Sequence, residues 1–187
     1  MTPYETRRLV VFVVLLAALI QGAAPWLPAQ AAHAQQYPNT IYLPLIVRPA
    51  STVHPYASRV VDLVNQERAK VGCASLAMNT ALNNAALAHS QDMALHDFFS
   101  HTGSDGSSPW ERMTRAGYQF SGAGENIAAG YTSPEDVMDG WMNSQGHRAN
   151  ILNCAFRDIG VGYVYLANDT GQVNYRHYWT QDFGTPR

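Results

Sequence analysis

Apolar side chains recur at intervals of three and four over two segments, which predicts two amphipathic helices. The first helix is expected from Tyr56 to Gly72, with its apolar face at Val60, Leu63, Val64 and Val71. The second should begin at a capping residue, Asn79 or Thr80, and end near Asp97. Its buried face is predicted to consist of Leu82, Ala85, Ala86, His89 and Met93.

Two further helices are indicated by their first residues. Ser108-Pro109-Trp110-Glu111 combines an N-cap serine, a proline at the first helical position and a capping-box glutamate. Ser133-Pro134-Glu135-Asp136 repeats this pattern and opens a helix that continues through Trp141. That helix is expected to break at Ser144-Gln145-Gly146, which places His147 directly after the break, where a side chain can be aimed into a cleft.

The remaining apolar segments predict strands. Residues 118–120 are expected to begin one strand, and the glycine-rich stretch 121–124 is expected to be a flexible loop. Residues 159–166 and 175–183 should form a hairpin around a turn at 168–171. Gly160 and Gly162 share one face of the hairpin, which favours close packing of a helix. The order of elements indicates an α+β fold, with helices packed on a small, mainly antiparallel sheet.

The amino terminus has the pattern of an exported precursor. Arg7 and Arg8 precede an unbroken apolar run at residues 9–20, and Ala32-His33-Ala34 forms an Ala-x-Ala cleavage site. The run is shorter than the roughly 20 apolar residues of a membrane span. We therefore expect a signal peptide at 1–34, a linker at 35–55 with an apolar patch at 41–47, and one domain at 56–187.

Charge and composition narrow the classes of partner. The chain has 12 basic and 14 acidic residues, and loss of Glu5, Arg7 and Arg8 with the signal peptide leaves a net charge near −3. It contains no basic tract, which argues against nucleic acid or an anionic membrane surface as partner. Only 14% of the residues are charged, against about 25% in typical domains. This balance is typical of a secreted protein.

The chain has two cysteines, Cys73 and Cys154, and both lie in the expected mature part. Export to an oxidising compartment favours a disulfide between them, with two buried free thiols as the alternative. Closing a loop of roughly 80 residues would contribute about 4 kcal/mol in the chain-entropy description.

Several motifs in order resemble the CAP superfamily, which comprises the cysteine-rich secretory, antigen 5 and pathogenesis-related proteins and their bacterial extracellular relatives. The resemblance covers residues 56–184 and rests on the order and spacing of short motifs. These include Ala88-His89-Ser90-Gln91-Asp92-Met93, Phe99-Ser100-His101, Gly124-Glu125-Asn126-Ile127-Ala128, Trp141-Met142-Asn143-Ser144-Gln145-Gly146-His147-Arg148 and Tyr178-Trp179-Thr180-Gln181.

The resemblance implies a three-layer α-β-α sandwich and a cleft lined by two histidines and two acids. Matched residue by residue, the histidines are His101 and His147, and the first acid is Glu125. The second acid would fall at Ser144, where this chain departs from the pattern.

Two imidazoles and a carboxylate are the donors of a divalent-metal site, for which Zn²⁺ is the best match. The same three groups can instead form a hydrogen-bonded cluster in which Glu125 fixes the tautomer of one imidazole. Without a second carboxylate, a metal-bound water lacks its most obvious general base, and Ser144 serves only as a hydrogen-bonding partner.

We therefore expect a secreted, monomeric CAP-domain protein whose cleft, formed by His101, Glu125, Ser144 and His147, takes an extracellular small molecule, lipid or protein. The alternative is a metal-dependent extracellular hydrolase that uses His101, Glu125 and His147, with Glu125 as ligand or base. A third hypothesis is an envelope-associated structural protein that relies on the linker.

Overall fold

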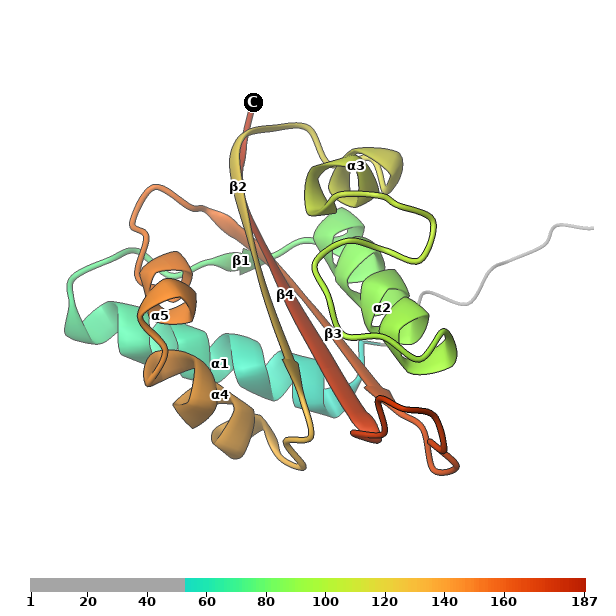
Figure 1. The fold of residues 1–187 in the computed structure, drawn as a ribbon. Helices are drawn as coiled ribbons and strands as arrows, with labels where there is room; N and C mark the ends of the chain where they lie inside the picture. Colours follow the sequence, from blue (N-terminus) through green and yellow to red (C-terminus); the bar gives the residue numbers. More distant parts are fainter. Residues whose placement is uncertain (1–52) are drawn as a thin grey trace, which may run out of the picture. The chain divides into compact units, whose positions relative to one another are not determined.

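Two layers of helices cover the two faces of one sheet in residues 53–187, the part of the chain that the computed structural model describes (Figure 1). One layer contains α1 (Pro55–Lys70), α4 (Pro134–Met142) and α5 (Gln145–Ile151). The other contains α2 (Thr80–Leu95) and α3 (Pro109–Arg115). This arrangement confirms the α+β class and the α-β-α sandwich.

The predicted signal peptide, residues 1–34, lies outside the described residues, as does the linker up to residue 52 with its apolar patch at 41–47. The last part of the linker is ordered into the fold. His54 is the N-cap of α1, and its side chain accepts a hydrogen bond from the Tyr56 N–H. No helix among residues 53–187 has both the length and the hydropathy needed to cross a bilayer.

The sheet has four strands in the order β1-β3-β4-β2. The long strands β2 (Phe120–Ala129) and β3 (Asp158–Tyr165) each pair antiparallel with β4 (His177–Pro186). The sequence did not predict β1 (Ala77–Met78), which pairs parallel with β3. Because β2 is last in this order, it is an edge strand, and only one of its sides is paired with another strand.

The helix starts follow the predicted capping chemistry. Asn79 accepts hydrogen bonds from two backbone N–H groups of α2. Ser108 and Glu111 form the reciprocal capping box of α3, and Ser133 accepts from the Asp136 N–H at the start of α4. A break after α4 is present, but it lies at Asn143 and Ser144 and not at 144–146, because α4 ends at Met142 and α5 begins at Gln145. The sequence did not predict α5 as a separate helix, and His147 lies inside it.

The prediction of a flexible loop at 121–124 was wrong. These residues lie inside β2, whose pairing with β4 runs from Phe120 to Ala129. Gly124 leaves room for close neighbours, because a Cβ at this position would lie 3.1 Å from both Asn150 Oδ1 and Phe156 Cζ. At this position the glycine therefore reflects close packing on a paired strand.

Gly160 and Gly162 have the use that was predicted for them. A Cβ on Gly160 would overlap the backbone of Leu82 and Asn83, and one on Gly162 would overlap the backbone of Ala86. Helix α2 therefore lies directly against β3, and it can approach the strand this closely because neither glycine has a side chain.

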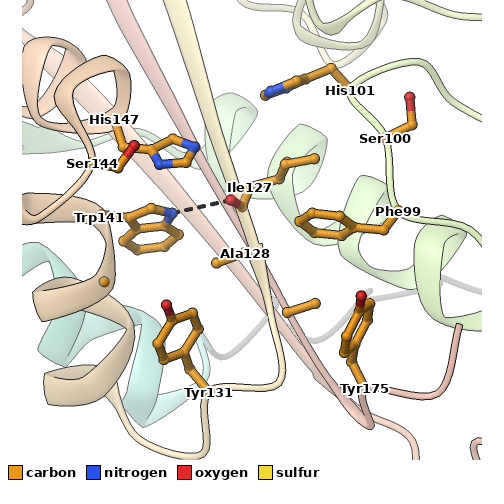
Figure 2. Close-up of a pocket in the computed structure, with 12 residues that line it drawn as sticks. Phe99, Ser100, His101, Ile127, Ala128, Tyr131, Trp141, Ser144, His147 and Tyr175 are labelled. Atoms are coloured by element: carbon orange, nitrogen blue, oxygen red, sulfur yellow. Dashed lines mark hydrogen bonds between the residues drawn. The ribbon is translucent and has the colours of Figure 1, made fainter.

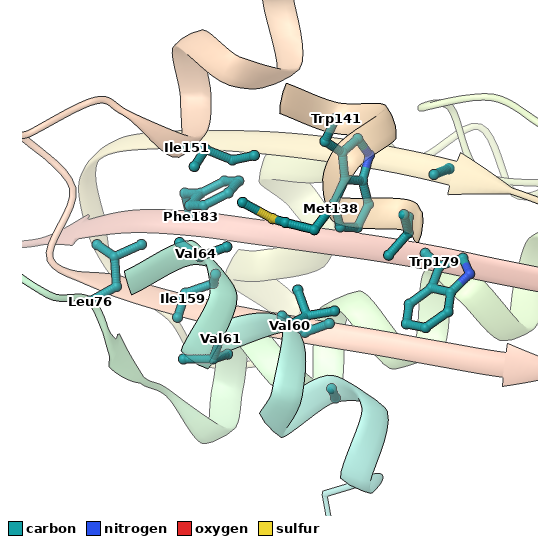
Figure 3. Packing of buried hydrophobic residues seen from close by; sticks show 14 of the residues in the cluster. Val60, Val61, Val64, Leu76, Met138, Trp141, Ile151, Ile159, Trp179 and Phe183 are labelled. Atoms are coloured by element: carbon teal, nitrogen blue, oxygen red, sulfur yellow. The ribbon is translucent and has the colours of Figure 1, made fainter. Parts of the chain in front are cut away.

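The larger apolar core fills the space between the sheet and the layer of α1, α4 and α5 (Figure 3). Its fully buried members include Val60, Val64, Trp141, Ile151, Ile159, Trp179 and Phe183. On the opposite face, Leu82 and Met113 join α2 to α3, and Met93 of α2 packs with Ile127 and Tyr178. The apolar clusters on the two faces of the sheet thus fix both helical layers relative to β2.

The predicted disulfide is confirmed. Cys73 and Cys154 are bonded, with Cα atoms 5.0 Å apart and a sequence separation of 81 residues. Beside it, the buried guanidinium of Arg68 donates to four backbone carbonyl groups, those of Ala74, Ile151, Asn153 and Phe156. The disulfide and Arg68 together tie the end of α1 to the chain that follows α5.

Candidate functional site

A cavity of about 590 Å³ opens between the two helical layers, in front of β2 (Figure 2). One side is formed by the segment that follows α2, and the other by α4, α5 and the loop before α4. Its lining residues are Phe99, Ser100, His101, Ile127, Ala128, Ala129, Tyr131, Gly140, Trp141, Ser144, His147 and Tyr175. The volume lies within the range of small-ligand sites.

His101 and His147 lie at one end of this cleft, one on each side (Figure 2). The His101 side chain is 52% exposed, and its Nδ1 lies 2.7 Å from Oε1 of Glu125. Because an ionised carboxylate only accepts hydrogen bonds, Nδ1 carries the proton, and Nε2 of the neutral ring keeps its lone pair.

Glu125 lies on β2 behind His101 and is almost completely buried. Its second oxygen, Oε2, accepts from the Arg112 guanidinium at 2.7 Å. The same guanidinium donates to the carbonyl oxygens of Ser107 at 2.8 Å and His101 at 3.0 Å. Arg112 therefore neutralises Glu125 and also fixes the backbone of His101.

His147 lies in the first turn of α5, where its carbonyl accepts from Asn126 Nδ2 at 3.1 Å. Burial, followed by the positive charge that His101 carries when it is protonated, lowers the pKa of the His147 imidazole below its ordinary value. The ring therefore favours its neutral form. Ser144 is the N-cap of α5, yet its side chain makes no capping hydrogen bond, which leaves the hydroxyl group at the cleft wall.

These positions, together with the three layers, can be compared with known proteins. The sequence profile described as CAP, the cysteine-rich secretory protein family, matches residues 61–183. The chain belongs to this family.

The CAP domain of this chain is 44% identical over 133 residues to YkwD of Bacillus subtilis, an uncharacterised protein, covering 71% of the chain and 48% of the relative. It is 34% identical to YlbC of the same organism, described as an uncharacterised membrane protein, over 67% of the chain and 33% of the relative. The chain thus spans half the length or less of these curated relatives.

A similar solved structure is an extracellular protein with an SCP domain from Bacillus anthracis, with a TM-score of 0.60 and 32% identity. That comparison covers 69% of this chain and 40% of the other. An outer surface protein of Borrelia burgdorferi shares the fold, with a TM-score of 0.62, 18% identity, and coverage of 70% and 92%.

The CAP domain brings the predicted residues together, but Glu125 does not match the role of metal ligand. Both of its oxygens are engaged, and a cation would have to compete with the Arg112 guanidinium already bound there. Within residues 53–187, no three His, Cys, Asp or Glu side chains are grouped as a metal site. The donor set for Zn²⁺ is thereby reduced to the two imidazoles, and metal binding stays a prediction.

Asp182 is a second carboxyl group that the sequence analysis missed. It lies on β4 directly opposite Glu125 and is 1% exposed, so the two carboxyl groups are buried next to each other. Burial, followed by the charge of Glu125, raises the pKa of Asp182 well above its ordinary value. The raised pKa favours the protonated form of Asp182, whose O–H can donate to Glu125. Asp182 lies far in sequence from Ser144, the position at which the resemblance places a second acid.

The aromatic walls of the cleft were also missed. Tyr175 was predicted to begin the last strand, 175–183, but it precedes β4 and is 48% exposed. It packs edge-on against Phe99, while Tyr131 lies on the other side of the cleft (Figure 2). In contrast, the prediction that His89 is a buried, hydrogen-bonded helix residue is correct, since it contacts the Ser100 carbonyl at 2.9 Å.

Proposed function

We propose that this protein is a secreted CAP-domain binding protein whose cleft takes an extracellular small molecule, lipid or protein. The proposal rests on one observation: Glu125 is bound within the protein, whereas the two imidazoles are available to a ligand. Glu125 is buried, and its two oxygens accept hydrogen bonds from His101 and Arg112, whereas His101 and His147 face the cavity. The cleft thus offers oriented hydrogen-bonding groups and no free carboxylate among its lining residues.

This arrangement supports binding over metal-dependent hydrolysis. In a metal-dependent hydrolase both imidazoles would be metal ligands, so another group has to take a proton from water, within hydrogen-bonding reach of the attacking oxygen. Glu125 is the one carboxylate of the predicted set, and it is held behind His101 by Arg112. Ser144, at the position where the resemblance places a second acid, offers a hydroxyl group, which is a weak base.

Secretion has support of three kinds. The amino terminus has the pattern of a signal peptide, and the Cys73–Cys154 disulfide suits an oxidising compartment. The relative from Bacillus anthracis is described as extracellular. We place this protein in the same compartment, where its cleft is open to soluble or surface-bound ligands.

The test is a fragment screen by nuclear magnetic resonance, with the histidine side chains isotopically labelled and EDTA present. Aromatic fragments with a polar group are expected to shift the ring signals of His101 and His147 and to lose affinity in Tyr131→Ala. His96, an exposed histidine at the end of α2, is the internal control. Metal content of the untreated protein is measured alongside. Stoichiometric zinc that is lost in His147→Ala, with no fragment binding, would overturn the proposal in favour of the hydrolase.

A further inference from the structure

The floor of the cleft is the free edge of the sheet. Strand β2 ends the strand order, and its residues Ile127, Ala128 and Ala129 line the cavity. Figure 2 shows this edge between Trp141 on one side and Phe99 on the other. An edge strand presents backbone N–H and C=O groups that can pair with another chain.

The register of β2 and β4 decides which of these groups are free. The Gly130 N–H donates to the His177 carbonyl of the β4 side at 2.9 Å. In an antiparallel strand both backbone groups of a residue point to the same side, and the side alternates along the chain. The backbone groups of Ala128 therefore point toward β4, while those of Ile127 and Ala129 point into the cleft.

Two side chains confirm this direction. Trp141 Nε1 donates to the Ile127 carbonyl at 3.2 Å, and Asn150 Nδ2 donates to the Glu125 carbonyl at 3.2 Å. Both carbonyls therefore point away from β4. Within residues 127–129 of this edge, three outward groups have no hydrogen-bonding partner among residues 53–187: the N–H of Ile127 and the N–H and C=O of Ala129.

We propose that this edge binds an extended peptide as an additional antiparallel strand. One peptide residue opposite Ala129 would exchange both backbone hydrogen bonds with it, and the carbonyl two residues further on would accept from the Ile127 N–H. All three free groups are then used. This proposal rests on the proposed function, because it names the ligand class of the same cleft.

The direction of β2 also orients the peptide. The strand runs from Glu125, next to the histidine pair, to Ala129. An antiparallel peptide therefore enters between Tyr131 and Tyr175 and carries its C-terminal part toward His101 and His147. Its side chains alternate between the Phe99–Tyr175 wall and the Trp141–Tyr131 wall, and both walls favour bulky apolar groups.

The test uses random linear heptapeptides displayed on phage and selected on the protein. The best peptide is synthesised with each amide N-methylated in turn. Methylation of the amide that donates to Ala129 should weaken binding at least tenfold, whereas methylation of the amides on either side of it should have little effect. This alternation is the signature of strand pairing.

Two variants complete the test. Ala129→Pro removes the outward N–H, which an edge strand tolerates, and should weaken the peptide at least tenfold. Ala129→Gly keeps the N–H and should bind like wild type. Melting temperatures of both variants show that the fold is retained.

Three results would overturn the inference: no peptide is enriched, N-methylation shows no alternation, or Ala129→Pro binds like Ala129→Gly. A homodimer that Ala129→Pro dissociates would also overturn it, because the edge would then be occupied by a second copy. If fragments still shift His101 and His147 while no peptide binds, only this inference fails. If neither binds, the proposed function fails with it.

Discussion

Asp182 and Glu125 lie directly opposite each other on β4 and β2, and both carboxyl groups are buried. Two ionised carboxylates side by side and away from water would repel strongly, which favours a pair that holds one proton and agrees with the raised pKa of Asp182. The guanidinium of Arg112, which binds Oε2 of Glu125, balances the negative charge that remains on the pair. The buried charges behind His101 are thus balanced within the protein.

The first prediction concerns the pH dependence of stability. A carboxyl group whose pKa is raised by folding stabilises the fold below its ordinary pKa, and this contribution is lost as pH rises through the folded pKa. Asp182→Asn keeps the donor to Glu125 and removes the titration. The free energy of unfolding of the variant relative to wild type should therefore rise from about pH 4 upward, by at most about 1.4 kcal/mol per pH unit. Urea denaturation at several pH values measures it, and a difference that is constant with pH would contradict the shared proton.

Arg112 is predicted to be a main structural support of the site. Its side chain is 9% exposed and that of Glu125 is 2% exposed, so Arg112→Met leaves a buried charge without its partner. The expected loss in unfolding free energy is about 3–5 kcal/mol. Arg115→Met is the matched control, because the Arg115–Asp105 pair is exposed and contributes little. Equal effects of the two substitutions would contradict the role of Arg112.

The disulfide is predicted to contribute about 4 kcal/mol through the loop between Cys73 and Cys154. The double variant Cys73→Ala/Cys154→Ala should lose that amount in urea denaturation. A thiol count on the unfolded, unreduced protein should give no free thiol. Detection of two thiols would show that the bond does not form in the secreted protein.

Gly140 is predicted to keep the cleft open. A Cβ at this position of α4 would collide with the Tyr131 ring, which has to move into the cavity. Gly140→Ala should weaken fragment binding about tenfold, which corresponds to about 1.4 kcal/mol. Gly146→Ala in α5 meets no atom within 4 Å, so it should leave affinity unchanged. Unchanged affinity in both variants would show that Tyr131 does not shape the binding site.

The sequence predicted α1, α2, α3 and α4 because their signals are local, whereas it did not predict α5 as a separate helix. Asn79, Ser108 and Ser133 each cap the helix that they were expected to cap. The resemblance to CAP proteins likewise identified His101, Glu125 and His147, which the fold brings to one place. Such predictions need only neighbouring residues or a known motif.

The features that the sequence did not predict depend on contacts between distant segments. Gly124 looks like a loop residue, and only the packing of Asn150 and Phe156 against it reveals a strand. Asp182 occupies an ordinary position in an alternating strand, so its pairing with Glu125 follows from the register alone. Strand β1 has two residues, which is too short for any periodic pattern.

The central claim is that Glu125 orients His101 for ligand binding and is neither a metal ligand nor a general base. Long-range ¹H–¹⁵N spectra of labelled histidines test this directly, because they report the protonation of each ring nitrogen. We predict that the neutral ring of His101 carries its proton on Nδ1, and that EDTA leaves its Nδ1 signal unchanged. Glu125→Gln should redistribute the two tautomers. An unprotonated Nδ1 in wild type, or an Nδ1 signal that EDTA displaces, would contradict the account.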